Sequence, residues 1–117
     1  MTTEQTSARF PYFWVRIGLE GREQDVEALL DTGFDGDIVV PVGFISPGLQ
    51  PDGQDTWALA DGSIVRASFY YGTAAVGDLG PFRALVSMLG DEPIVGVGFI
   101  RNFAVTLDHG QRVIVEP

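Results

Sequence analysis

The stretch best suited to chemistry is Leu29-Leu30-Asp31-Thr32-Gly33, where an apolar strand runs directly into an acid, a hydroxyl and a glycine. Acidic residues are depleted in strands and are rarely buried without a partner, so an aspartate at this position needs a reason. Gly33 lets the backbone turn sharply just after the acid. We therefore expect Asp31 to sit on a rigid loop, partly shielded from water, where a carboxylate suits acid–base chemistry.

The tripeptide Asp31-Thr32-Gly33 alone is more typical of an ordinary turn than of a site, because aspartate and glycine both favour turns. The nearby Asp35 and Asp37 are open to the same two interpretations, as site residues or as solvated loop acids. Signals elsewhere in the chain have to decide between the two.

The composition restricts the classes of function. The chain of 117 residues has the length of one domain, and its hydrophobic content of 45% argues against disorder. A net charge of -9 argues against nucleic acids and anionic membranes as partners, since both attract positive charge. The absence of cysteine excludes disulfides and thiolate catalysis, and a single histidine, His109, argues against a zinc site. We expect neither a metal nor a cofactor.

Residues 1–9 are polar and are predicted to form a flexible N-terminal arm, followed by a single domain over residues 10–117. The arm lacks the apolar segment of a signal peptide, and no stretch approaches the roughly 18–20 apolar residues of a membrane span. We therefore expect a cytoplasmic protein with no membrane partner.

The many glycines and prolines indicate short strands joined by turns, the pattern of an all-β chain. A hairpin that turns at Glu20-Gly21 would carry Asp31 at the end of its second strand. Residues 43–55 are rich in Gly, Pro, Ser and Gln and predict a surface loop. A second hairpin is predicted around Asp61-Gly62, with both turn residues at positive φ.

One short helix is predicted over residues 97–103, because Phe99, Ile100 and Phe103 would share an apolar face. The rest of the chain consists of short strand-like runs without internal repeats. These features together predict a small closed β-barrel.

Three motifs, in order, resemble the retropepsin-like aspartic proteases, the family of retroviral protease. Residues 28–35 (Ala-Leu-Leu-Asp-Thr-Gly-Phe-Asp) resemble the catalytic loop of that family. Leu59-Ala60-Asp61-Gly62-Ser63 resembles the flap tip of small bacterial relatives, and Ile94-Val95-Gly96 resembles the motif that packs under the catalytic loop. The resemblance spans residues 12 to 108 and implies an all-β closed barrel of the acid-protease type with one short helix near residues 97–103.

This resemblance implies an aspartic endopeptidase, with Asp31 as the general acid/base and with Thr32 and Gly33 shaping its loop. Asp35 would contact the backbone of an extended peptide or protein substrate. The expected flap residues that bind substrate are Ala60, Asp61, Gly62 and Ser63. The expected pocket walls are Val40, Trp57, Leu59 and Ile64.

Aspartic-protease chemistry needs two carboxylates about 3 Å apart, which share one proton because both cannot ionise. The chain contains one Asp-Thr-Gly. A homodimer would bring Asp31 of each subunit to the two-fold axis, and two-fold symmetry is the commonest arrangement of oligomers.

Phe34 departs from the family, which usually has Ala or Ser after Asp-Thr-Gly; its ring would either narrow the cleft or pack outward. The alternative function is a catalytically silent retropepsin-like module for dimerisation or peptide binding, because a fold does not settle a function. A third possible function is that of a processing enzyme with a single cellular substrate.

Overall fold

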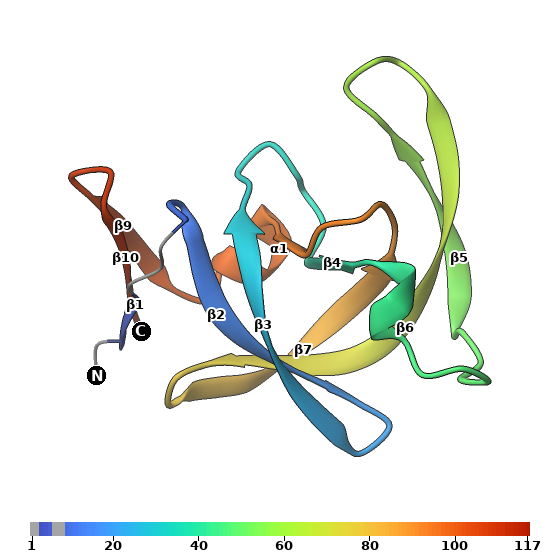
Figure 1. Cartoon of the computed structure of the whole chain (residues 1–117), viewed down its shortest axis with the longest axis horizontal. Coiled ribbons are helices and arrows are strands. Elements are labelled where there is room, and N and C mark those ends of the chain that lie inside the picture. The colour runs from blue at the N-terminus through green and yellow to red at the C-terminus, as the bar shows by residue number, and fades with distance from the viewer. Residues whose placement is uncertain (1–2, 6–8) are drawn as a thin grey trace.

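A computed structural model of the chain describes residues 3–5 and 9–117 (Figure 1). The regular elements of the described residues are strands, apart from one turn of 3₁₀-helix and one turn of α-helix. In chain order the elements are β1 (Thr3–Gln5), β2 (Tyr12–Leu19), β3 (Arg22–Leu30), β4 (Ile38–Val40), η1 (Val42–Phe44), β5 (Gly53–Ala58), β6 (Ile64–Val76), β7 (Leu79–Met88), β8 (Ile94–Val95), α1 (Val97–Ile100), β9 (Ala104–Asp108) and β10 (Arg112–Glu116).

Within the described residues, six strands close into a ring. They are hydrogen-bonded in the order β2-β3-β8-β4-β7-β6, and β6 pairs back onto β2 where Ala75 lies opposite Arg16. The seventh strand of this sheet, β5, pairs only with β6, and the two form a hairpin that extends away from the ring (Figure 1). The predicted closed β-barrel is therefore confirmed.

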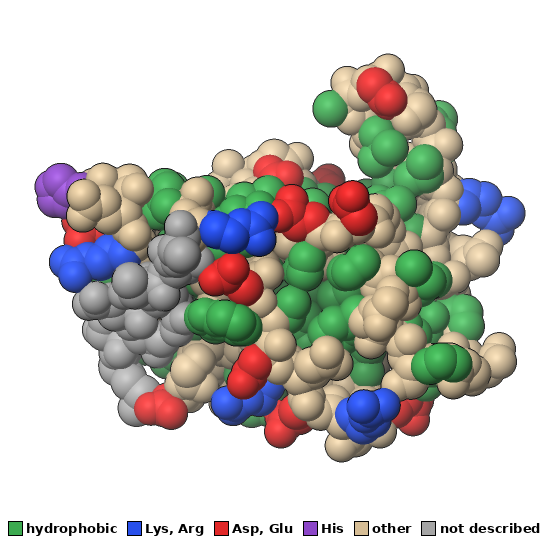
Figure 2. Space-filling model, in the orientation of Figure 1, with side chains coloured by type: hydrophobic (Ala, Val, Ile, Leu, Met, Phe, Trp, Pro, Cys, Tyr) green, Lys and Arg blue, Asp and Glu red, His purple; other side chains and the backbone are tan. Residues whose placement is uncertain are grey.

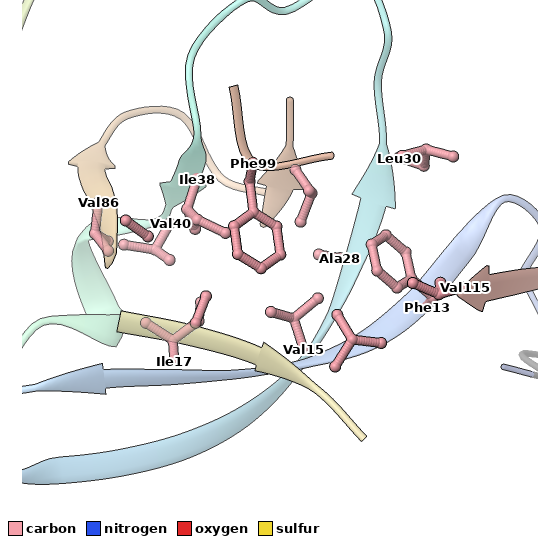
Figure 3. Close-up of a cluster of buried hydrophobic side chains, with 14 of the residues drawn as sticks. Phe13, Val15, Ile17, Ala28, Leu30, Ile38, Val40, Val86, Phe99 and Val115 are labelled. Carbon is pink, nitrogen blue, oxygen red and sulfur yellow. The ribbon is translucent and has the colours of Figure 1, made fainter. Parts of the chain in front are cut away.

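The core lies inside the ring and follows from the alternation of each strand. In β2 the side chains of Phe13, Val15 and Ile17 are buried, whereas Trp14 and Arg16 between them are exposed. Figure 3 shows the ring of Phe99 from α1 directed among the side chains of the strands. The single helical turn therefore closes one end of the barrel by contributing a fully buried aromatic side chain.

The β2–β3 hairpin has the tight turn predicted from Glu20-Gly21. Both residues have positive φ, 50° for Glu20 and 76° for Gly21. This is the backbone twist that a two-residue turn needs to join twisted antiparallel strands. The paired register from Leu19 opposite Arg22 to Tyr12 opposite Leu29 then fixes where the second strand ends.

The prediction of a loop over residues 43–55 is wrong at both ends of that range. The 3₁₀-turn η1 covers its start, and β5 begins at Gly53, which lies opposite Phe69 of β6. A Cβ atom on residue 53 would come within 2.8 Å of Phe69 Cε2, so the glycine makes room for that ring. The glycine-rich composition predicted a loop here, but Gly53 begins strand β5 and its lack of a side chain leaves space for Phe69.

The second hairpin and the helix also differ from the predictions. Only Gly62 has positive φ, because the turn is a loop of residues 59–63 in which the Leu59 N–H donates to Ser63 O at 2.8 Å. The helix ends at Ile100 rather than at residue 103. Phe103 nevertheless packs with the helix, since its ring centroid lies 5.3 Å from that of Phe99.

A second, three-stranded sheet lies beside the barrel in the order β1-β10-β9. Residues 1–2 and 6–8 of the predicted flexible arm lie outside the described residues, whereas Thr3–Gln5 forms a strand opposite Val113–Val115. The division into an arm and a domain stays a prediction. None of the helices in the described part of the chain has the length and apolar character needed to cross a bilayer.

Candidate active site

Asp31 stands at the point where β3 leaves the barrel. The last residues of β3 pair in parallel with β8, with Leu30 opposite Val95, and the Asp31 N–H donates to Val95 O at 3.0 Å. The side chain of Leu30 is buried, and Asp31 is half-buried. The strand pairing thus extends up to the acid and fixes its backbone.

The loop after Asp31 folds back onto its carboxylate. The Gly33 N–H donates to Asp31 Oδ1 at 2.8 Å, and the Phe34 N–H donates to Asp31 O at 3.2 Å. A side-chain acceptor two residues before the donor is the usual way in which aspartate stabilises a turn. The bond from Gly33 orients the carboxylate, and the bond from Phe34 closes the turn through the backbone carbonyl of Asp31.

Three successive backbone amides at the start of α1 donate hydrogen bonds to this loop. Gly96, Val97 and Gly98 donate their N–H groups to Asp37 O, Phe34 O and Gly36 O, at 2.8, 2.8 and 2.9 Å. A Cβ atom on residue 96 would overlap Gly36 O, and one on residue 98 would lie 2.9 Å from it. The close approach of helix and loop therefore requires glycine at both positions.

Asp37 acts in this scaffold as a structural group. It is half-buried, and its Oδ2 accepts the N–H of Leu85 on β7 at 2.9 Å. This bond joins the end of the Asp31 loop to the barrel wall, where β4 pairs in parallel with β7. Of the two loop acids considered from the sequence, Asp35 is exposed and Asp37 is half-buried.

A cleft of about 440 Å³ opens beside Asp31, under the β5–β6 hairpin. In Figure 2 this hairpin projects from the body of the molecule and leaves a notch beneath it. The residues that line the cleft are Asp31, Gly33, Phe34, Val39, Trp57, Ala58, Leu59, Ala60, Leu89, Gly90, Asp91, Glu92 and Ile94. They come from the Asp31 loop, the hairpin and the segment that precedes β8. A larger hollow of about 890 Å³ lies elsewhere, near Arg22 and Arg83, and Asp31 does not line it.

The structure brings together only part of the predicted set. Asp31 and Gly33 share the cleft with Ala60, and so do the expected wall residues Trp57 and Leu59. The remaining predicted site residues are exposed and do not line this cleft: Thr32, Asp35, Asp61, Gly62 and Ser63. The roles of these residues stay predictions.

Two expected wall residues are wrong. Val40 is fully buried in the core, and its neighbour Val39 lines the cleft instead, because successive side chains of β4 point to opposite sides. Ile64 is 70% exposed and lies outside the cleft. Sequence reasoning also missed the wall formed by residues 89–92, for which the chain offers no recognisable motif.

Glu92 ties this wall to β2. Its Oε1 accepts a hydrogen bond from the Tyr12 hydroxyl and one from Arg9 Nη2 at 2.8 Å, and the Arg9 guanidinium stacks over the Tyr12 ring at 3.8 Å. The hydrogen bond from Tyr12 is the main cause that lowers the pKa of Glu92 below its usual value. The two hydrogen bonds to Glu92 therefore join the wall at residues 89–92 to the start of β2.

The tip of the hairpin has a local structure similar to that of the Asp31 loop. Asp61 Oδ1 accepts the backbone N–H of Ser63 at 2.9 Å and its hydroxyl at 2.6 Å. The hydrogen bond from the Ser63 hydroxyl, followed by that from its N–H, lowers the pKa of Asp61. No three His, Asp or Glu side chains in residues 3–5 and 9–117 form a group that could hold a metal ion.

No family model matches this chain, and a search among curated proteins finds no match. Among solved structures, the crystal structure of a retropepsin-like aspartic protease from Rickettsia conorii is similar, with a TM-score of 0.63. The match covers 98% of this chain and 90% of that chain at 13% sequence identity. At this identity the likeness shows a retropepsin-like fold.

Proposed function

We propose that this chain is an aspartic endopeptidase, which hydrolyses peptide bonds with water activated between two Asp31 carboxylates, one from each subunit of a homodimer. The observation that carries the proposal is the setting of Asp31. Its carboxylate is oriented by the Gly33 N–H at 2.8 Å, is supported by α1 and lines a cleft beneath a projecting hairpin. The likeness in fold to a retropepsin-like aspartic protease supports the same reaction class.

The homodimer is proposed because a single carboxylate cannot be acid and base at once. In the proposed pair, the ionised Asp31 accepts a proton from water, and the protonated Asp31 of the other subunit donates one to the carbonyl oxygen. Two such groups at close range share a single proton, since simultaneous ionisation places like charges together. Thr32, which is exposed next to Asp31, is proposed to donate a hydrogen bond across the two-fold axis.

The proposed reaction balances over one cycle. The oxygen of the deprotonated water attacks the carbonyl carbon and gives a tetrahedral diol. The diol then collapses, the carbon–nitrogen bond breaks, and the amine nitrogen takes up the proton first removed from water. The diol returns the other proton to the pair, so the two carboxylates end with the single shared proton with which they began.

The β5–β6 hairpin is proposed to act as a flap over an extended peptide. Its tip, residues 60–63, would offer backbone N–H and C=O groups to the peptide and would exclude water when closed. Asp35, which is exposed four residues after Asp31, would accept N–H groups of the peptide backbone.

The test compares the wild-type protein with Asp31→Asn on a complex peptide mixture between about pH 4 and 7, the range that a shared-proton pair favours. We expect cleavage by the wild type, none by the variant, and the same molar mass in solution for both. A monomeric protein with full activity would contradict the dimer. Retained peptide binding without cleavage by either protein would instead support the alternative function as a silent binding module.

A further inference from the structure

Phe34 directs its side chain into the cleft wall rather than outward. The residue is half-buried and lines the same cleft as Asp31. A Cβ atom on residue 36 would lie 2.9 Å from Phe34 Cε1, and one on residue 96 would overlap Phe34 Cδ2. The ring therefore rests on the bare backbone of Gly36 and Gly96, which holds it in the wall of the cleft that Asp31 also lines.

Trp57, which belongs to the β5–β6 hairpin, packs against the ring of Phe34. The two ring centroids are 5.1 Å apart with planes tilted by 56°, a favourable arrangement for aromatic rings. The outer edge of the indole also reaches the loop, since a Cβ atom on Gly36 would lie 2.9 Å from Trp57 Cη2. One aromatic ring from the Asp31 loop and one from the hairpin thus form a bridge across the cleft.

The indole of Trp57 is held by ring packing. Its Nε1 is buried and has no hydrogen-bond partner in the part of the chain that the structure describes. Because no hydrogen bond from Nε1 to a described residue holds the indole, its position depends on contacts with the rings and backbone around it. The Phe34–Trp57 contact is therefore one of the contacts that place the indole in the cleft wall.

We infer that the Phe34–Trp57 pair fills the part of the cleft next to Asp31 and limits the substrate to a small side chain at the peptide position that faces the pair. Glycine, alanine or serine fits there, whereas leucine or phenylalanine would have to displace a ring that the loop backbone holds. The inference deepens the proposed function and rests on it. In a homodimer the restriction would apply once on each side of the scissile bond.

The expected size of the change in specificity follows from how strongly hydrophobic pockets discriminate between side chains of different size. Each methylene that a pocket admits or excludes changes specificity by about 10- to 200-fold. Phe34→Ala removes a whole ring from the wall and opens that volume next to Asp31. The ratio of kcat/KM for leucine over alanine at the facing position should therefore rise at least about tenfold.

The experiment profiles wild type and Phe34→Ala with a position-scanning peptide library. Binding of the same library to Asp31→Asn and to Asp31→Asn/Phe34→Ala gives a second readout that does not depend on cleavage. We expect one or two positions to change from small to large apolar side chains in both readouts. Phe34→Leu, which keeps an apolar contact with the two glycines, supplies an intermediate profile if Phe34→Ala does not fold.

Tyr71→Ala is the matched control. It removes a second aromatic pair of the same hairpin, Phe69–Tyr71 at 5.6 Å, but Tyr71 is 70% exposed and lies outside the Asp31 cleft. Its profile should equal that of the wild type. Identical profiles for the wild type and Phe34→Ala, a wild-type preference for large side chains at every position, or no binding of any peptide would overturn the inference. A changed binding profile without any cleavage by the wild type would support the inference and contradict the proposed endopeptidase.

Discussion

Two aspartate loops of this chain have nearly the same local structure and different surroundings. Asp31 Oδ1 accepts the N–H of Gly33 at 2.8 Å, and Asp61 Oδ1 accepts the N–H of Ser63 at 2.9 Å. Asp31 is half-buried at the end of a barrel strand, whereas Asp61 is exposed at the tip of a hairpin. The turn-forming hydrogen bond is common to both and cannot by itself make a site.

The difference lies in what packs against each loop. Three amides of α1 donate to the segment after Asp31, and glycines at positions 96 and 98 allow contact with the backbone. The Asp61 loop is stabilised by hydrogen bonds within residues 59–63. Long-range backbone contacts therefore hold the Asp31 loop against α1, whereas the hydrogen bonds given for the Asp61 loop are local to the hairpin tip.

The largest expected effect comes from exchanging each aspartate for asparagine. Asp31→Asn should lower kcat/KM by at least about 10³-fold, the scale of losing one member of a catalytic group that acts as a unit. Asp61→Asn retains an acceptor for Ser63 and should leave cleavage nearly unchanged. Initial rates on a single cleaved peptide measure both. Comparable losses in the two variants would show that the loops do not differ in the way proposed.

The next effect tests the support beneath Asp31. Gly96→Ala places a methyl group against Gly36 O, so we expect a loss of about 1–3 kcal/mol in the free energy of unfolding, together with reduced cleavage. Urea denaturation followed by tryptophan fluorescence measures the first quantity. Gly43→Ala is the control, because a Cβ atom there meets no atom within 4 Å. A Gly96→Ala protein as stable as the control would refute the role of this contact.

The smallest effect concerns the Asp61 loop. Ser63→Ala removes the hydroxyl that lowers the pKa of Asp61, and we expect that pKa to rise toward 3.8. Because the folded pKa is depressed, the loop gains stability above pH 3.8 and loses it as the pH falls through the lowered value. Carboxyl ¹³C shifts followed by NMR during titration measure the change. An unchanged titration of Asp61 would mean that the Ser63 hydroxyl does not bind it in solution.

The same comparison explains what the sequence could predict. The barrel, the Glu20-Gly21 turn and the position of Asp31 follow from apolar alternation and turn residues, which are local signals. The wall around Glu92 and the replacement of Val40 by Val39 in the cleft depend on which strands meet across the barrel. The sequence left the direction of the Phe34 side chain open for the same reason, since one of the two glycines that its ring covers, Gly96, lies far along the chain.

Subunit mixing tests whether two Asp31 side chains act as one catalytic group. Wild-type protein is mixed with increasing Asp31→Asn protein and allowed to exchange subunits, and activity per wild-type chain is measured at a constant total concentration. The account predicts that this activity falls in proportion to the wild-type fraction, because mixed dimers hold only one aspartate at the axis. Activity per wild-type chain that does not change with the mixing ratio, once mass spectrometry has verified the exchange, would contradict it.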